Sequence, residues 1–262
     1  MSPFCIDRAI IVWNGNPFYN SYWNFISKIW KNNFGITPTL IYVGEPSKEV
    51  CDYHLCEQYG EIHFLPEVKE VVVNPSRDWA VTWALFYGAT LFPDDVCMTH
   101  GVDQVPLSDK FLRDMDAYDF EKGDYVIGLV DAHYNEDWHV SSNHVAKGST
   151  YKTALSIEDD WSDEVKKVFE FRNDYGDMYG GGDYWGLEEI HSSVLLKKYD
   201  RELLKEHMGY EDFDSRMLNL NANAPDLERL RKGGYSEMLA PRPFWVDPKI
   251  LSDIIDHTPK YC

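Results

Sequence analysis

Ala9-Ile-Ile-Val-Trp-Asn-Gly-Asn-Pro17 joins a short apolar run to a turn signal. The run is rich in β-branched residues and is bounded by Asn, Gly and Pro, so it predicts a buried strand that ends at Trp13. Apolar side chains then recur at helical spacing between Phe18 and Phe34, and Gly35 follows as a helix stop. We expect this strand–turn–helix unit to begin an α/β domain.

The same alternation continues through the first half of the chain. Strands are expected at Thr39–Val43, Glu61–Leu65 and Val96–Thr99, and helical patterns fall between them at Ser47–Cys56 and Arg77–Leu91. Strands that alternate with helices predict a mixed, mostly parallel sheet that is flanked by helices.

The second half has a less regular pattern. The expected elements are a strand at Asp124–Val130 and helices at Tyr184–Lys197 and Pro248–Ile255. Residues 131–147 are polar and aromatic, residues 173–182 are rich in Gly, Tyr and Asp, and both are expected to be irregular. Long irregular segments of a compact domain tend to carry function. No repeat, low-complexity tract or linker divides the chain, so residues 1–262 are expected to form a single domain.

Charge and composition exclude several classes of protein. The 262 residues include 25 Lys and Arg against 44 Asp and Glu, a formal net charge of −19 at pH 7. Nucleic-acid binders need a basic surface for phosphate contacts, so we expect no nucleic-acid partner. The longest apolar runs are far below the roughly 20 residues of a membrane span, and no secretory signal pattern opens the chain. The five scattered cysteines lack metal-ligand spacing, and these features together favour reduced thiols and a cytoplasmic location.

The residues that directly follow the predicted strands are the first candidates for a site, because ligands of open α/β sheets bind beyond the carboxyl ends of the strands. They are Asn14, Gly15 and Asn16, then Gly44 and Glu45, then Gly101, Asp103 and Gln104. None of them forms a GxGxxG or GxxxxGK[ST] sequence. A Rossmann dinucleotide site and a P-loop are therefore not supported.

The segment Val96–Ser108 places Asp103 just past a predicted buried strand and before a short apolar stretch. It resembles the (S/T)-D-x-D-x-x-P-L region of glycosyltransferases of the GT-A fold. Three more segments are similar to the same family: 13–19 to its nucleotide-binding first loop, 37–44 to its second strand, and 77–87 to the helix before its acidic motif. The resemblance implies a GT-A-like (Rossmann-like) domain with a nucleotide-sugar-binding half at 1–110 and an acceptor-binding half at 111–262.

The resemblance also implies a nucleotide-diphosphate sugar as donor substrate. The positions that it implies for the donor are Trp13, Asn14, Asn16, Gly44, Glu45, Arg77, Asp103, Gln104 and Arg242. The family holds Mn²⁺ or Mg²⁺ with an acidic pair, which implies Asp103 as a ligand and His100 as an assisting one; alternatively the His100 ring packs under the loop. Gly101 stands where the family usually has its first Asp. A single carboxylate is few ligands for such a cation, so Arg77, Lys147 or Arg242 is the alternative partner of the diphosphate.

A Gly-rich loop runs into a predicted helix at Gly180–Ile190. Acidic residues in a first helical turn are expected from the helix dipole alone, but this segment also resembles the W-G-x-E-[DE] loop of inverting GT-A enzymes. The resemblance implies Glu188 as general base, followed in order by Glu189 and Asp183, and thus an inverting hexosyltransferase. Trp185 would give the sugar an apolar face.

Histidines and aromatic residues are interleaved between residues 131 and 149. His133, His139 and His144 fit no zinc spacing, whereas rings among Asn, Asp and His suit a glycan acceptor; a surface loop with buried aromatic anchors is the alternative. His191 and the other histidines of the C-terminal part are expected to be solvated.

The sequence thus predicts sugar transfer from a nucleotide-diphosphate donor to a hydroxyl of a glycan or glycoconjugate. A nucleotidyltransferase and a non-catalytic carbohydrate-binding, transferase-like module are the alternatives.

Overall fold

The structure is a computed structural model that describes residues 3–68, 79–129, 139, 141–175, 187–200, 202–207, 218–220, 225–239 and 247–261. Five of the residues singled out in the sequence, Arg77, His133, Asp183, Trp185 and Arg242, lie outside the described residues.

A seven-stranded sheet in the order β3-β2-β1-β4-β7-β6-β8 forms the centre of the molecule. Its strands are β1 (Arg8–Trp13), β2 (Thr37–Val43), β3 (Glu61–Leu65), β4 (Val96–His100), β6 (Val126–Leu129), β7 (Val145–Lys147) and β8 (Leu204–His207). Among the described strands, β7 alone runs antiparallel to its neighbours β4 and β6. The expected mixed, mostly parallel sheet is confirmed.

A second, three-stranded sheet joins distant parts of the chain. Its order is β5-β10-β9, with β5 at Gln104–Pro106, β10 at Glu237–Leu239 and β9 at Leu218–Asn219. β10 is antiparallel to β5 and parallel to β9. The sequence did not predict this sheet, because strands of two or three residues are too short to show a period.

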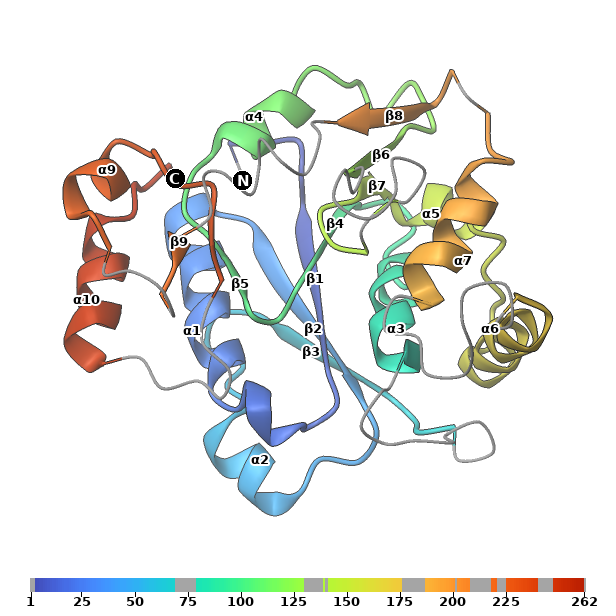
Figure 1. Ribbon diagram of the computed structural model, residues 1–262, viewed down its shortest axis with the longest axis horizontal. Coiled ribbons are helices and arrows are strands. Elements are labelled where there is room, and N and C mark those ends of the chain that lie inside the picture. Colours follow the sequence, from blue (N-terminus) through green and yellow to red (C-terminus); the bar gives the residue numbers. More distant parts are fainter. Residues whose placement is uncertain are drawn as a thin grey trace.

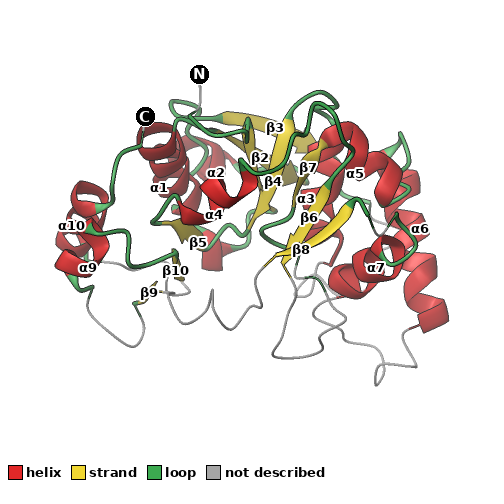
Figure 2. Ribbon diagram, turned by 90° about the horizontal axis from the view of Figure 1, so that it is seen from above, coloured by secondary structure: helices red, strands yellow, loops and turns green. Residues whose placement is uncertain are grey.

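Helices cover both faces of the large sheet. They are η1 (Pro17–Tyr19, 3₁₀), α1 (Tyr22–Ile29), η2 (Trp30–Phe34, π), α2 (Lys48–Tyr53), α3 (Trp79–Thr90), α4 (Lys110–Met115), α5 (Gly148–Ala154), α6 (Trp161–Tyr175), α7 (Leu187–Leu196), α9 (Leu227–Arg231) and α10 (Pro248–His257). Figures 1 and 2 show α1, α2 and α4 on one side of the sheet and α3, α5, α6 and α7 on the other. No helix among these described ones is long and apolar enough to cross a membrane.

Alternation along β1 divides the core between the two helical layers. Ile11 and Trp13 pack in the layer that contains α1, whereas Ile10 and Val12 pack in the layer that contains α3. This is the period of two that a strand imposes on its side chains. Burying each such side chain contributes about 1.5–3 kcal/mol to the free energy of unfolding.

Three expectations need correction in detail. The single helix expected between Phe18 and Phe34 is a 3₁₀ turn, an α-helix and a π turn, although Gly35 does end it with φ +69°. The loop expected at 173–182 begins too early, because α6 continues to Tyr175. The irregular segment expected at 131–147 ends in the strand β7, which pairs with β4 along one edge.

Candidate active site

The turn that carries Asp103 follows β4 and is closed by its own residues. The side-chain Oε1 of Gln104 accepts the N–H of Gly101 at 3.1 Å, and the N–H of Gln104 donates to the carbonyl of Gly101 at 3.2 Å. A Cβ atom at position 101 would lie 2.5 Å from that Oε1. The amide of Gln104 therefore occupies the space that an acidic side chain at 101 would need. Asp103 itself is 7% exposed.

His100 lies beneath this turn and is fully buried. Its Nδ1 is 3.1 Å from the carbonyl oxygen of Gly101, and its Nε2 is 3.1 Å from Oε1 of Glu237. The ring also contacts Trp30 edge-on, with centroids 5.1 Å apart. Each ring nitrogen thus lies against an oxygen atom of the chain, which leaves neither of them open to a cation. The ring packs under the loop, as the alternative reading of the sequence had it.

The described residues do not fit a cation that is held by protein groups alone. Among them, no group of three or more His, Cys, Asp or Glu side chains could hold a metal ion. Asp103 brings one carboxylate to the turn, whereas a hard divalent cation takes six or more oxygen ligands.

The loop after β1 is shaped by the residues that the sequence singled out. The indole Nε1–H of Trp13 donates to the carbonyl of Asn16 at 3.0 Å, and the side chain of Asn14 accepts the N–H of Asn16 at 3.1 Å. Asn16 then caps the 3₁₀ turn η1. Gly15 has φ +78°, and a Cβ there would overlap the hydroxyl of Tyr42. Trp13, Asn14 and Asn16 thus hold the loop in one conformation.

The loop after β2 leaves open space above the backbone. Gly44 has φ +102° and donates its N–H to the carbonyl of Leu65 at 2.8 Å, and apart from its two chain neighbours no described residue has an atom within 4 Å of the place where a Cβ would stand. Glu45 beside it is exposed. A glycine backbone in open space allows close approach of a ligand.

Strand register brings these three loops to the same edge of the sheet. β1 is parallel to both of its neighbours, with Trp13 opposite Tyr42 of β2 and Ile11 opposite His100 of β4. The predicted donor residues of the first half that are described therefore gather at the carboxyl ends of adjacent strands, where α/β sheets bind ligands.

Lys147 does not belong to this group. It pairs in register with Val96 at the amino end of β4, and its Nζ lies 3.0 Å from the carboxylate of Glu121. The proposed role of Lys147 at a diphosphate is therefore wrong, because β7 runs antiparallel and carries the residue to the opposite end of the strand. Arg77 and Arg242 lie outside the described residues.

The start of α7 is tied to the end of β4. Oε1 of Glu189 accepts the N–H of Ser141 at 3.1 Å, and the carbonyl of Ser141 accepts the hydroxyl of Thr99 at 2.8 Å. Thr99 directly precedes His100 in β4. This chain of hydrogen bonds connects the first turn of α7, with Glu188 and Glu189, to the strand that leads into the Asp103 turn.

Glu188 is a buried carboxyl group with 5% of its surface exposed. Burial, together with the charge of Glu189, raises the pKa of Glu188 to about 8. The group therefore carries its proton at neutral pH. A general base must be ionised to accept a proton, so the raised pKa lowers the fraction of Glu188 that can act as a base at neutral pH.

The described histidines of the predicted acceptor segment are interior residues. His139 and His144 are buried with ring centroids 5.9 Å apart, and the ring of Phe86 lies 5.3 Å from that of His144. Gly128 makes room for them, because a Cβ there would lie 2.8 Å from the His139 ring. His133 lies outside the described residues.

The expectation that His191 is solvated is wrong. It is buried between the rings of Trp83 and Phe171, with centroids at 4.8 and 4.2 Å. Burial, and the nearby charge of Lys167, lower its pKa to about 4. The helix α7 is packed against both α3 and α6, so residues that look polar in the sequence still fall inside.

No protein-family model and no curated protein sequence matches the chain. Solved structures do match it. The galactosyltransferase LgtC, in complex with donor and acceptor sugar analogues, superposes with a TM-score of 0.55 and 11% identity over 97% of this chain and 97% of that chain. The chain has the fold of LgtC. The expected GT-A-like fold is thereby confirmed.

Two further structures were matched. An active-site mutant of LgtC gives a TM-score of 0.52 with 12% identity over 88% of this chain and 86% of that one. The glycosyltransferase GlyE of Streptococcus pneumoniae TIGR4 gives 0.47 with 9% identity over 80% of this chain, which spans 46% of GlyE.

Proposed function

We propose that the protein is a glycosyltransferase that moves a hexose from a nucleotide-diphosphate sugar to a hydroxyl of a glycan or glycoconjugate. The observation that carries the proposal is the match to LgtC, a galactosyltransferase, over 97% of both chains. The three loops that converge at one edge of the sheet support it, because they contain the residues that the GT-A motifs single out.

The donor would lie across these loops. Its base and ribose would meet Trp13–Asn16 and the open backbone at Gly44 and Glu45, and its diphosphate would meet the turn of Asp103 and Gln104. Among the described residues no group of three or more metal-ligating side chains is found, and the turn offers a cation the carboxylate of Asp103. Mn²⁺ and Mg²⁺ are therefore added separately in the experiment that follows.

The acceptor would approach from the side of α7. An inverting transfer requires a base within hydrogen-bond reach of the acceptor hydroxyl, and Glu188 is the proposed group. Because its pKa is about 8, the rate of transfer should rise with pH through that value when Glu188 serves as the base.

A thermal-shift screen tests the donor. UDP, GDP, CDP and dTDP are each added with Mn²⁺, Mg²⁺ or EDTA, and one nucleotide is expected to stabilise selectively. At about 100 times Kd, binding adds about 2.7 kcal/mol and raises Tm by roughly 5–8 °C. Asp103→Asn should reduce this shift, whereas the exposed Asp119→Asn should leave it unchanged. A flat response to all four nucleotides would contradict the proposal.

The non-catalytic module stays a second candidate, because burial raises the pKa of Glu188 and Gly101 stands where the family usually has its first acidic residue. Release of a nucleoside diphosphate distinguishes the transferase from the binding module. A transferase releases a nucleoside diphosphate from the donor in a long incubation at pH 8.5, while a binding module shows the thermal shift and releases none.

A further inference from the structure

Glu237 is a buried carboxylate directly beneath the Asp103 turn. It is 3% exposed, its Oε1 lies 3.1 Å from Nε2 of His100, and its Oε2 has no hydrogen-bond partner among the described residues. Burying a carboxylate is costly unless it is paired. Loss of the contact with His100 would leave both oxygens of this buried group without a partner among the described residues, and it should therefore destabilise this part of the fold.

The backbone of the same strand holds the other side of the turn. In the antiparallel pair of β10 with β5, Glu237 lies opposite Pro106 and Leu239 lies opposite Gln104. Strand β10 therefore holds the turn on both sides. The side chain of Glu237 contacts His100, which precedes the turn, and the backbone of Leu239 pairs with Gln104, which follows Asp103.

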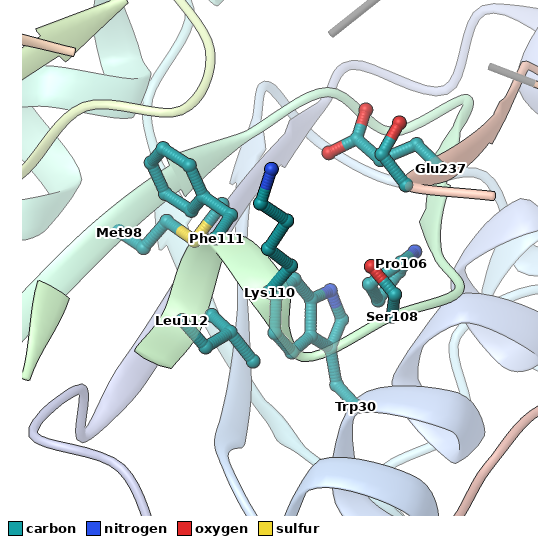
Figure 3. Close-up of a pocket in the computed structure, with 9 residues that line it drawn as sticks. Trp30, Met98, Pro106, Ser108, Lys110, Phe111, Leu112 and Glu237 are labelled. Carbon is teal, nitrogen blue, oxygen red and sulfur yellow. The ribbon is translucent and has the colours of Figure 1, made fainter. Parts of the chain in front are cut away.

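A recess behind the turn explains why Oε2 lacks a protein partner. Figure 3 shows Glu237 at this recess together with Trp30, Met98, Ser108, Lys110 and Phe111. The centres of water molecules have about 20 Å³ available there, which is enough for about one or two waters and too little for a sugar ring. Glu237 therefore faces solvent-sized space and not a substrate.

We infer that Glu237 is a positioning residue for the Asp103 turn. Through His100 it fixes the carbonyl of Gly101, which in turn accepts the N–H of Gln104, so that Asp103 between them has one orientation toward the donor. The inference rests on the proposed function for its consequence at the substrate. Its structural part, the order of the turn, can be measured without any substrate.

Hydrogen exchange of the full chain tests the structural part. In Glu237→Met, which keeps the side-chain length and removes the acceptor, the amides of Gly101 and Gln104 should exchange about tenfold faster, equivalent to about 1.4 kcal/mol of local stability. Glu237→Gln retains an acceptor oxygen and should restore most of the protection. Glu164, a fully buried carboxylate of the other layer, provides the control: Glu164→Met should loosen α6 and leave the turn protected.

His100→Phe removes the other partner of the same contact. If Glu237→Met does not fold, the exchange of the Gly101 and Gln104 amides is measured in this variant instead. Unchanged exchange at residues 101 and 104 in the folded variants, or faster exchange over the whole chain to the same degree, would overturn the inference.

Measurements of nucleotide affinity test whether the order of the turn matters for donor binding. With UDP, GDP, CDP and dTDP as probes, any affinity that the wild-type chain shows should weaken about tenfold in Glu237→Met and recover in Glu237→Gln. Local loosening of the turn with no nucleotide bound by the wild-type chain would leave the positioning role standing and count against the proposed function. Nucleotide binding that is equally tight in wild type and Glu237→Met would overturn the inference and leave the proposed function standing.

Discussion

Glu188 has almost no contact with water, and its ionisation is therefore coupled to folding. The folded chain holds a proton on this carboxyl up to pH 8, whereas the unfolded chain releases it near pH 4.5. Between these values the folded state binds more protons, so this group lowers the free energy of unfolding as pH rises from about 4.5 to 8.

Glu188→Gln should remove that dependence. We expect the variant to exceed the wild-type chain in stability by about 4–5 kcal/mol at pH 8.5 and to match it near pH 4.5. Urea unfolding at the two pH values measures this, and Glu170→Gln, at an exposed position of α6, should change neither. Equal stabilities of Glu188→Gln and wild type at pH 8.5 would show that the carboxyl is not held protonated by the fold.

Gly15 and Gly44 form a matched pair of glycines with positive φ. At Gly15 a Cβ overlaps the Tyr42 hydroxyl, whereas at Gly44 it meets open space. Gly44→Ala should cost about 1 kcal/mol for the backbone alone, and Gly15→Ala about 1–3 kcal/mol in total.

Adding Tyr42→Phe should recover part of the loss in Gly15→Ala and none in Gly44→Ala. Thermal unfolding of the single and double variants gives the comparison. Equal losses at the two glycines, unaffected by Tyr42→Phe, would exclude the overlap as a cause.

At the scale of elements, β1, β2 and β4 were predictable because each is a buried strand with a run of apolar residues, and the edge strand β3, which is only partly buried, was predictable from its place in the strand–helix alternation. β1, β2, β3 and β4 were all expected within two residues of their observed bounds. The small sheet was less predictable because β5, β9 and β10 have two or three residues, and their pairing is decided by tertiary contacts.

Some residues of the candidate site could be predicted from the sequence and others could not. Residues that follow strands of the first half could be found from position alone, since strand ends of a parallel sheet meet. Glu237 could not, because its partner His100 is 137 residues away and no local pattern marks the pair. The burial of His191 was missed for a related reason, since both faces of α7 are covered.

The helix α10 begins after the N-cap residue Asp247 and has Pro248 as its first residue. The side chain of Asp247 accepts the N–H of Lys249 at 2.7 Å. Asp247→Ala should lower the free energy of unfolding by about 0.5–2 kcal/mol, and Asp247→Asn, which keeps the accepting oxygen, should lose much less. Chemical denaturation of both variants tests the cap; equal losses would assign the effect to charge instead.

The whole molecule carries a formal net charge of −19, and repulsion among its surface carboxylates opposes compaction. Raising NaCl from about 20 mM to about 500 mM screens this repulsion over distances beyond a few ångströms. We therefore expect Tm to rise with salt at pH 7 in a thermal melt. A fall in Tm would mean that attractive pairs such as Arg8 with Glu61 outweigh the repulsion.

The last described residues complete a layer that the first ones begin. The N–H of Tyr261 donates to the carbonyl of Asn33 at 2.7 Å, the side chain of Asn33 donates to the carbonyl of Thr258, and the ring of Tyr261 stacks on that of Phe34. On a ribosome, η2 emerges long before these partners are made. The aromatic surface of Phe4 and Phe34 lacks its Tyr261 partner until that residue has been made, so the nascent chain carries over that interval a patch that a chaperone could bind.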